Sequence, residues 1–174
     1  MNVLGRWLLA TMVVGLLAIL AASAQVADPS RSEKSATLSR SKQVGISLLL
    51  YCSDYDDVLP WPQDSHSCWR AIHPYSKNRD IFKTLNPNGG EFAFNMALGG
   101  VSMRDISAPE RTIMVHETKA WPDGGRVGTH VDGSARFFTA EMWKERAKTL
   151  NLKLKRTAKK PLPKDWLKKE MGDW

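Results

Sequence analysis

The stretch from Lys42 to Pro60 constrains this chain most, because it has the pattern of a helix that ends in an acidic turn. Three aspartates fall within four positions near its end, and charged side chains of this kind cannot continue a buried helical face. The residue before Pro60 is also pushed out of the α region. Apolar residues sufficient to bury one face of the helix come earlier in the stretch: Val44, Ile46, Leu48, Leu49, Leu50 and Tyr51. We therefore predict a helix from about Ser32 to Tyr55, against which the rest of the chain packs as a small sheet.

Positive charge is concentrated at one end of the sequence. The formal net charge is +7, yet lysine plus arginine balance aspartate plus glutamate at 13 against 13 over residues 25–140. Residues 141–174 carry 11 basic against 5 acidic side chains. The sequence thus divides into a flexible polar leader, residues 25–34, a domain, residues 35–140, and a basic C-terminal extension, residues 141–174.

Residues 1–24 have the composition of a Sec signal peptide. Arg6 supplies a short positive segment, residues 7–20 form an apolar run of 14, and Ala22-Ser23-Ala24 is a small-residue cleavage site. A bilayer-spanning helix takes about 20 apolar residues, so this run is short for a membrane anchor. We expect cleavage after Ala24 and an exported protein in the periplasm, at the cell surface or outside the cell. An uncleaved membrane anchor is the alternative.

Export bears on the only two cysteines, Cys52 and Cys68. An oxidising compartment permits a disulfide between them, which contributes about 3 kcal/mol in the chain-entropy model. The alternative is a pair of separate buried thiols that act as small apolar residues. Both alternatives stay open on the sequence.

Short elements follow the acidic turn. In residues 68–75, the side chains of Trp69, Ile72 and Tyr75 recur every three positions, which predicts a helix of one or two turns limited by Pro74.

Extended segments come next. Phe92–Phe94 is a short aromatic strand, and the continuous apolar run within residues 111–117 predicts a central strand. Asp132-Gly133 lies between two extended runs, which predicts a two-residue hairpin turn. The chain becomes helical again from Glu141.

Taken in order, these motifs resemble those of bacterial pilin-like proteins of the H-X9-DG, or DUF1559-type, family. The resemblance covers roughly residues 38–140. It is carried by Lys42 to Tyr51, Asp54 to Pro60, Trp69, Pro74 to Asn78, Ile81-Phe82, Asn95, Leu98 to Gly100, Ile106, Pro109 to Thr112, and the Asp132-Gly133 hairpin with Arg136 to Phe138.

The resemblance implies an α+β fold in which an N-terminal helix lies on a small antiparallel sheet, as in type II secretion pseudopilins. It implies an exported, non-enzymatic structural or adaptor protein of the bacterial envelope. Its partners would be other envelope or pilin-like proteins, and no small-molecule substrate is indicated.

The chain departs from this family in two places. A Sec-type signal stands where the family has a glycine cut site followed by Phe-Thr-Leu-x-Glu, the signal on which filament assembly depends. Lys83-Thr84-Leu85-Asn86-Pro87 stands where relatives tend to show Cys-Pro, so the pairing of cysteines that the resemblance implies need not apply to this chain.

Asp54, Asp56 and Asp57 are candidate Ca²⁺ ligands, because this hard cation takes several carboxylate oxygens. They lack the regular spacing and terminal glutamate of an EF-hand, so solvated carboxylates at a helix end are the simpler explanation. No other cofactor is indicated.

No catalytic set is predicted. Successive strand residues point to opposite faces, so His116 and Glu117 cannot act together. The histidines match no metal-ligand spacing: His66, His73, His116 and His130.

The basic extension interleaves lysine and arginine with Trp143 and Trp166. Clustered positive charge of this kind binds phosphate, so the alternative function is an extracytoplasmic module that engages DNA or another anionic polymer. A charged, solvated extension explains the composition equally well.

Overall fold

The computed structural model of the chain describes residues 29–162. The chain divides into two compact units, residues 1–32 and 33–174, and the second holds nearly all of the described elements. The predicted signal peptide, residues 1–24, lies outside the described residues, as do residues 163–174. Among the described helices, none combines the length and apolar composition needed to cross a membrane.

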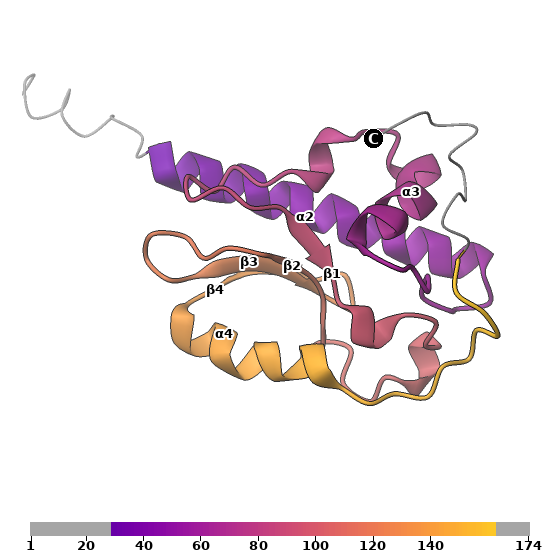
Figure 1. The fold of residues 1–174 in the computed structure, drawn as a ribbon. Helices are drawn as coiled ribbons and strands as arrows, with labels where there is room; N and C mark the ends of the chain where they lie inside the picture. The colour runs from indigo at the N-terminus through magenta and orange to yellow at the C-terminus, as the bar shows by residue number, and fades with distance from the viewer. Residues whose placement is uncertain (1–28, 163–174) are drawn as a thin grey trace, which may run out of the picture. The chain divides into compact units, whose positions relative to one another are not determined.

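The described residues form a mixed α+β fold, which confirms the α+β part of the predicted fold class (Figure 1). The C-terminal extension, predicted to be helical, is not helical over residues 152–162. The strands form one antiparallel sheet in the order β1-β2-β3-β4. The helices are α2 (Pro29–Asp54), α3 (Ser65–Ser76) and α4 (Ala140–Arg146), and the strands are β1 (Phe92–Phe94), β2 (Ile113–Glu117), β3 (Arg126–His130) and β4 (Ala135–Phe138). The 3₁₀ turns are η1 (Asp80–Phe82), η2 (Met96–Leu98), η3 (Met103–Asp105) and η4 (Ala147–Asn151).

The long N-terminal helix is confirmed as α2, which begins at Pro29 and ends at Asp54. Beyond its end, Asp56 and Asp57 adopt left-handed backbone conformations with φ of 55° and 60°. A right-handed helix cannot continue through these conformations, so the acidic turn stops α2 as the sequence indicated.

The buried face of α2 differs from the predicted apolar one. Ile46 and Leu50 are 44% and 46% exposed, whereas small polar residues are buried. The hydroxyl oxygens of Ser41 on α2 and Thr129 on β3 are 2.7 Å apart, and the Thr129 hydroxyl also donates to the Ser41 carbonyl at 2.9 Å. The helix and strand therefore approach closely, and only small side chains fit between them. The buried residues of this face are Thr37, Ser41, Val44, Gly45, Ser47, Leu48, Tyr51 and Cys52.

The helix predicted around Trp69 is longer than one or two turns. It begins at Ser65 because the Asp64 carboxylate caps it, accepting a hydrogen bond from the Ser67 backbone nitrogen at 2.6 Å. Pro74 lies in the last turn, and Lys77 then ends α3 in a left-handed conformation with φ of 49°.

The predicted hairpin is present, but its turn has three residues instead of two. The His130 backbone nitrogen donates to the Ser134 carbonyl at 2.9 Å, which leaves residues 131–133 in the loop. Of these, Gly133 alone has positive φ, at 83°. A two-residue type I′ turn requires positive φ at two positions, whereas a three-residue loop needs it only at the last.

The sheet has a helix on each face (Figure 1). Successive strand residues point to opposite sides of the sheet, so neighbouring residues of one strand lie on the sides of different helices. Thr129 contacts α2, and the next residue, His130, lies on the side of α4, where its ring is 5.3 Å from that of Phe138. On the same side, Trp143 of α4 lies 5.3 Å from His116 and 6.2 Å from Phe138, measured between ring centroids.

Candidate functional site

The aspartates of the acidic turn have separate partners. Asp54 accepts a hydrogen bond from the Tyr75 hydroxyl at 2.7 Å, and Asp57 pairs with Arg104 at 2.9 Å. In the described part of the chain, no three His, Cys, Asp or Glu side chains are arranged to hold a metal ion. The structure therefore does not bring Asp54, Asp56 and Asp57 together as Ca²⁺ ligands. The turn instead ties the end of α2 to α3 and η3.

Cys52 and Cys68 are both buried and are not bonded to each other. Burial raises the pKa of the Cys52 thiol to about 12. Burial, followed by the neighbouring Cys52, raises the pKa of Cys68 well above its ordinary range. As thiols, both side chains are therefore neutral and unreactive in the folded protein. The disulfide between them stays a prediction.

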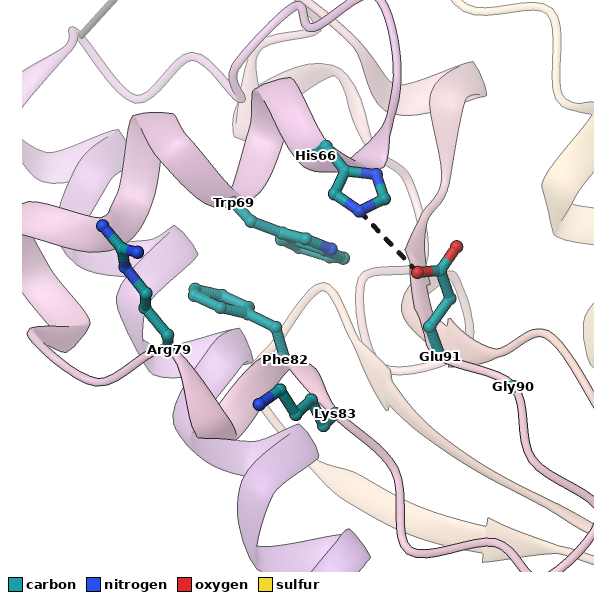
Figure 2. A pocket seen from close by; sticks show the side chains of 7 residues that line it. All are labelled: His66, Trp69, Arg79, Phe82, Lys83, Gly90 and Glu91. Carbon is teal, nitrogen blue, oxygen red and sulfur yellow. Dashed lines mark ion pairs between the residues drawn. The ribbon is translucent and has the colours of Figure 1, made fainter. Parts of the chain in front are cut away.

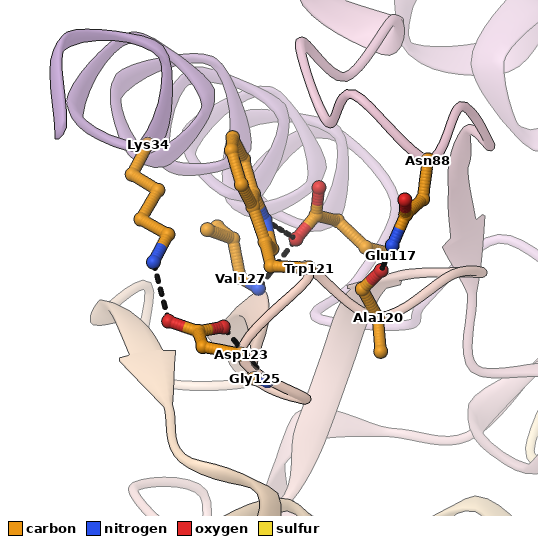
Figure 3. A network of polar contacts seen from close by, with 8 residues as sticks. All are labelled: Lys34, Asn88, Glu117, Ala120, Trp121, Asp123, Gly125 and Val127. Carbon is orange, nitrogen blue, oxygen red and sulfur yellow. Dashed lines mark hydrogen bonds and ion pairs between the residues drawn. The ribbon is translucent and has the colours of Figure 1, made fainter. Parts of the chain in front are cut away.

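Glu117, at the end of β2, is a buried carboxylate that holds three segments together (Figure 3). Its side chain is only 1% exposed. One oxygen accepts hydrogen bonds from Trp121 Nε1 at 2.7 Å and from the Val127 backbone nitrogen at 2.6 Å, and the other accepts from the Thr84 hydroxyl. The charge is thus matched by three donors, which fixes the loop between β2 and β3.

Two further contacts hold the same loop (Figure 3). Lys34 of α2 pairs with Asp123 at 2.5 Å, and its ammonium group lies over the rings of Trp121 and Phe137, at 5.4 and 4.6 Å from their centroids. On the other side, the Asn88 amide donates to the Ala120 carbonyl at 2.9 Å. We assign this network a structural role.

The four histidines do not form a common site. His66 lies on α3 in a pocket described below, and His73 lies further along the same helix. His116 and His130 lie under α4, where burial lowers the pKa of both; Arg126 adds to this effect at His116 and Arg146 at His130.

The hydrogen bonds around His130 fix which ring nitrogen carries the proton. Ser134 donates its hydroxyl proton to the Asp132 carboxylate at 2.7 Å, so His130 Nδ1, 3.1 Å from the same hydroxyl oxygen, must be the donor. The opposite nitrogen, Nε2, is buried and has no hydrogen-bond partner within residues 29–162.

An open pocket of about 460 Å³ lies where α3, η1 and the start of β1 meet (Figure 2). Trp69 and Phe82 stack inside it with ring centroids 5.2 Å apart and planes 16° from parallel. His66 and Glu91 face each other across one side at 3.9 Å, while Arg79 and Lys83 lie on the other. An aromatic floor with both charge signs at the rim suits a polar segment of another molecule. We take this pocket as the candidate functional site.

Part of the C-terminal extension packs against the domain. We call residues 147–162 the basic strap. Within it, Arg156 donates from Nε to the Gly99 carbonyl at 3.0 Å and lies over the Trp61 ring at 4.7 Å from its centroid. The Gly100 carbonyl accepts from the backbone nitrogens of residues 157 and 158, at 2.7 and 3.0 Å. The strap is thus fixed to the loop that precedes η3.

Sequence reasoning identified some of these residues and missed others. The sequence places Trp69 on a helical face and Phe82 among the family motifs, but nothing in it indicates that their rings stack. Glu117 was not identified as a hub; the available signal was a carboxylate at the end of the apolar run in residues 113–117.

Comparison of the chain with protein-family models, with curated proteins and with solved structures finds no match.

Proposed function

We propose that the chain is an exported, non-enzymatic pilin-like adaptor or structural protein of the bacterial envelope, and that it engages its partner through the pocket beside α3. The observation that carries this proposal is the close packing of α2 along one antiparallel sheet, through Ser41, Gly45 and Thr129. A helix laid on a small antiparallel sheet is the arrangement that the resemblance to pilin-like proteins implies.

The pocket supports a binding role. Its stacked aromatic floor is held rigid by the core, because Trp69 and Phe82 are 2% and 5% exposed. Its charged rim is exposed and presents both signs, so it can pair with a partner that carries both. A rigid base with an adaptable polar rim is typical of protein-binding sites.

Site-specific photo-cross-linking in a bacterial host that exports the chain tests this proposal. A photoreactive residue replaces Lys83 on the pocket rim, and a matched variant carries it at Arg136, an exposed residue of β4. We expect an adduct with an envelope protein from position 83 and none from position 136. Equal labelling from the two positions, or adducts only with cytoplasmic proteins, would reject the pocket as the partner site.

A further inference from the structure

The surplus charge of the C-terminal extension lies entirely within the basic strap. Residues 141–146 contain two basic and two acidic side chains, and residues 163–174 contain three of each. The strap itself has six basic residues and no acidic one: Lys148, Lys153, Lys155, Arg156, Lys159 and Lys160. The extension is therefore not uniformly basic; its charge is a single block on an ordered segment.

The strap presents these charges in a fixed orientation. Leu154, Ala158 and Leu162 are partly buried; the two leucines pack against the core, and Ala158 lies against Gly100. Arg156, on the same side, holds Gly99 and Trp61. Residues 154, 156 and 158 thus contact the domain in alternation, as in a strand. The lysines between and after these anchors are exposed: Lys153, Lys155, Lys159 and Lys160.

We propose that the basic strap binds a linear phosphodiester chain, with single-stranded nucleic acid as its ligand. The four exposed lysines follow one another within residues 153–160, and a single strand presents its phosphates in the same linear order. Lysines form point-charge contacts with phosphates, without the planar geometry that arginine imposes. The Trp61 ring beside the strap already lies under Arg156 and is not free to stack on a base, so we assign the contacts to the phosphate backbone.

This inference does not rest on the pilin-like proposal. The strap anchors to the loop at Gly99 and Gly100, whereas the proposed partner site lies at α3 and η1. An absence of cross-linking at position 83 would therefore count against the pocket alone, and an absence of nucleic-acid binding would count against the strap alone.

Binding of a fluorescent oligothymidine to the full chain, measured by anisotropy over a range of salt concentrations, tests the inference. If four lysines each neutralise one phosphate, the logarithm of affinity falls with the logarithm of salt with a slope of about −3. A strap variant replaces four lysines by glutamine: K153Q, K155Q, K159Q and K160Q. A charge-matched control replaces four exposed basic residues elsewhere: K42Q, K77Q, R111Q and K119Q.

We expect the strap variant to lose at least tenfold in affinity at low salt and nearly all of the salt slope, while the control keeps both. Equal losses in the two variants would show attraction to net charge alone and overturn the proposal. So would an unmodified chain that does not bind at about 50 mM salt. The replaced lysines point away from the core, so thermal unfolding of all variants should coincide.

Two further experiments test whether the strap must be held in place and which ligand it prefers. R156K keeps the charge but loses the Nε bond to Gly99, so it should weaken binding at an unchanged salt slope; an unchanged affinity would refute the fixed strap. In the second experiment, inorganic polyphosphate and duplex DNA are each added as competitors of the bound oligothymidine. Competition by polyphosphate alone supports a phosphate chain as the ligand, whereas displacement by duplex at a lower concentration than by unlabelled single strand contradicts the proposed linear fit.

Discussion

Gly45 lies where α2 crosses β3, and it shows how a single residue sets the distance between helix and sheet. A Cβ atom added there would stand 2.5 Å from Cγ2 of Thr129. Thr129 cannot rotate away, because its hydroxyl bonds to Ser41. Alanine favours a helix over glycine by about 1 kcal/mol. We nevertheless expect G45A to lower the free energy of unfolding, by about 1–3 kcal/mol, since overpacking dominates.

A second substitution makes this prediction specific. T129S keeps the hydroxyl that bonds Ser41 and removes the obstructing methyl group. In urea denaturation, most of the loss caused by G45A should disappear when it is introduced into the T129S background. The same loss in both backgrounds would show that the Cβ clash is not its cause.

The Glu117 carboxylate is predicted to be the most sensitive polar group of the β2–β3 loop. E117Q removes the charge and one acceptor oxygen. If its remaining oxygen keeps Trp121 Nε1 and the Val127 amide, its nitrogen faces the Thr84 hydroxyl, which must change from donor to acceptor although it already accepts from the Asn86 backbone nitrogen. Loss of these charge-assisted hydrogen bonds costs about 1.5–3 kcal/mol. Denaturant unfolding should show this loss for E117Q, while E91Q, at an exposed site, should change stability by less than about 0.5 kcal/mol. Similar losses of unfolding free energy in the two variants would show that Glu117 does not hold the loop together.

At the scale of elements, the histidines buried under α4 predict that the free energy of unfolding depends on pH. His116 and His130 lie under this helix beside Arg126 and Arg146, with Asp132 and Glu110 as the acids near His130. Their folded pKa values lie below the ordinary 6.5, so the unfolded state takes up more protons as the pH falls. Their contribution to stability is complete above about pH 6.5 and is lost progressively below it.

Unfolding free energies measured between about pH 7.5 and 5 check this dependence. The loss on acidification should be smaller in a variant that carries H116Q and H130Q than in the unmodified chain. Carboxylates such as Asp123, whose pKa is lowered from 3.8 by its bond to Lys34, do not titrate in this window. A loss that survives in the double variant would place the pH sensitivity elsewhere.

Local sequence signals predicted the elements well and their contacts less well. The end of α2, the central strand β2 and the turn at Gly133 follow from acidic residues, apolar continuity and glycine, which act locally. Burial of Ser41 in place of Ile46 does not, because it depends on the close approach to β3. The docking of the strap on Trp61 joins segments far apart in the chain, and no short pattern encodes such a pairing.

For the candidate pocket the same limit applies. Trp69 and Phe82 are identifiable as apolar residues of short helical segments, but their stacking depends on how α3 and η1 meet. Of the predicted Ca²⁺ ligands, Asp54 and Asp57 bond instead to Tyr75 and Arg104, neither of which the spacing of the aspartates indicates.

For the molecule as a whole, the state of the two cysteines shows whether the chain has passed through an oxidising compartment. Burial predicts that Cys52 and Cys68 resist alkylation while the protein is folded. Unfolding without a reductant then separates the two alternatives, because free thiols take up two alkyl groups and a disulfide takes up none. Rapid alkylation of the folded protein would contradict the buried positions of both cysteines.

The proposed envelope function requires export, and the intact mass of the full chain expressed in a bacterial host, measured in each cell fraction, tests export most directly. We predict a mass that begins at Gln25, found in the periplasm, at the cell surface or in the medium. A membrane fraction that retains residues 1–24 would indicate the anchored form of the same protein. A chain that keeps residues 1–24 and stays in the cytoplasm would contradict the proposed envelope function.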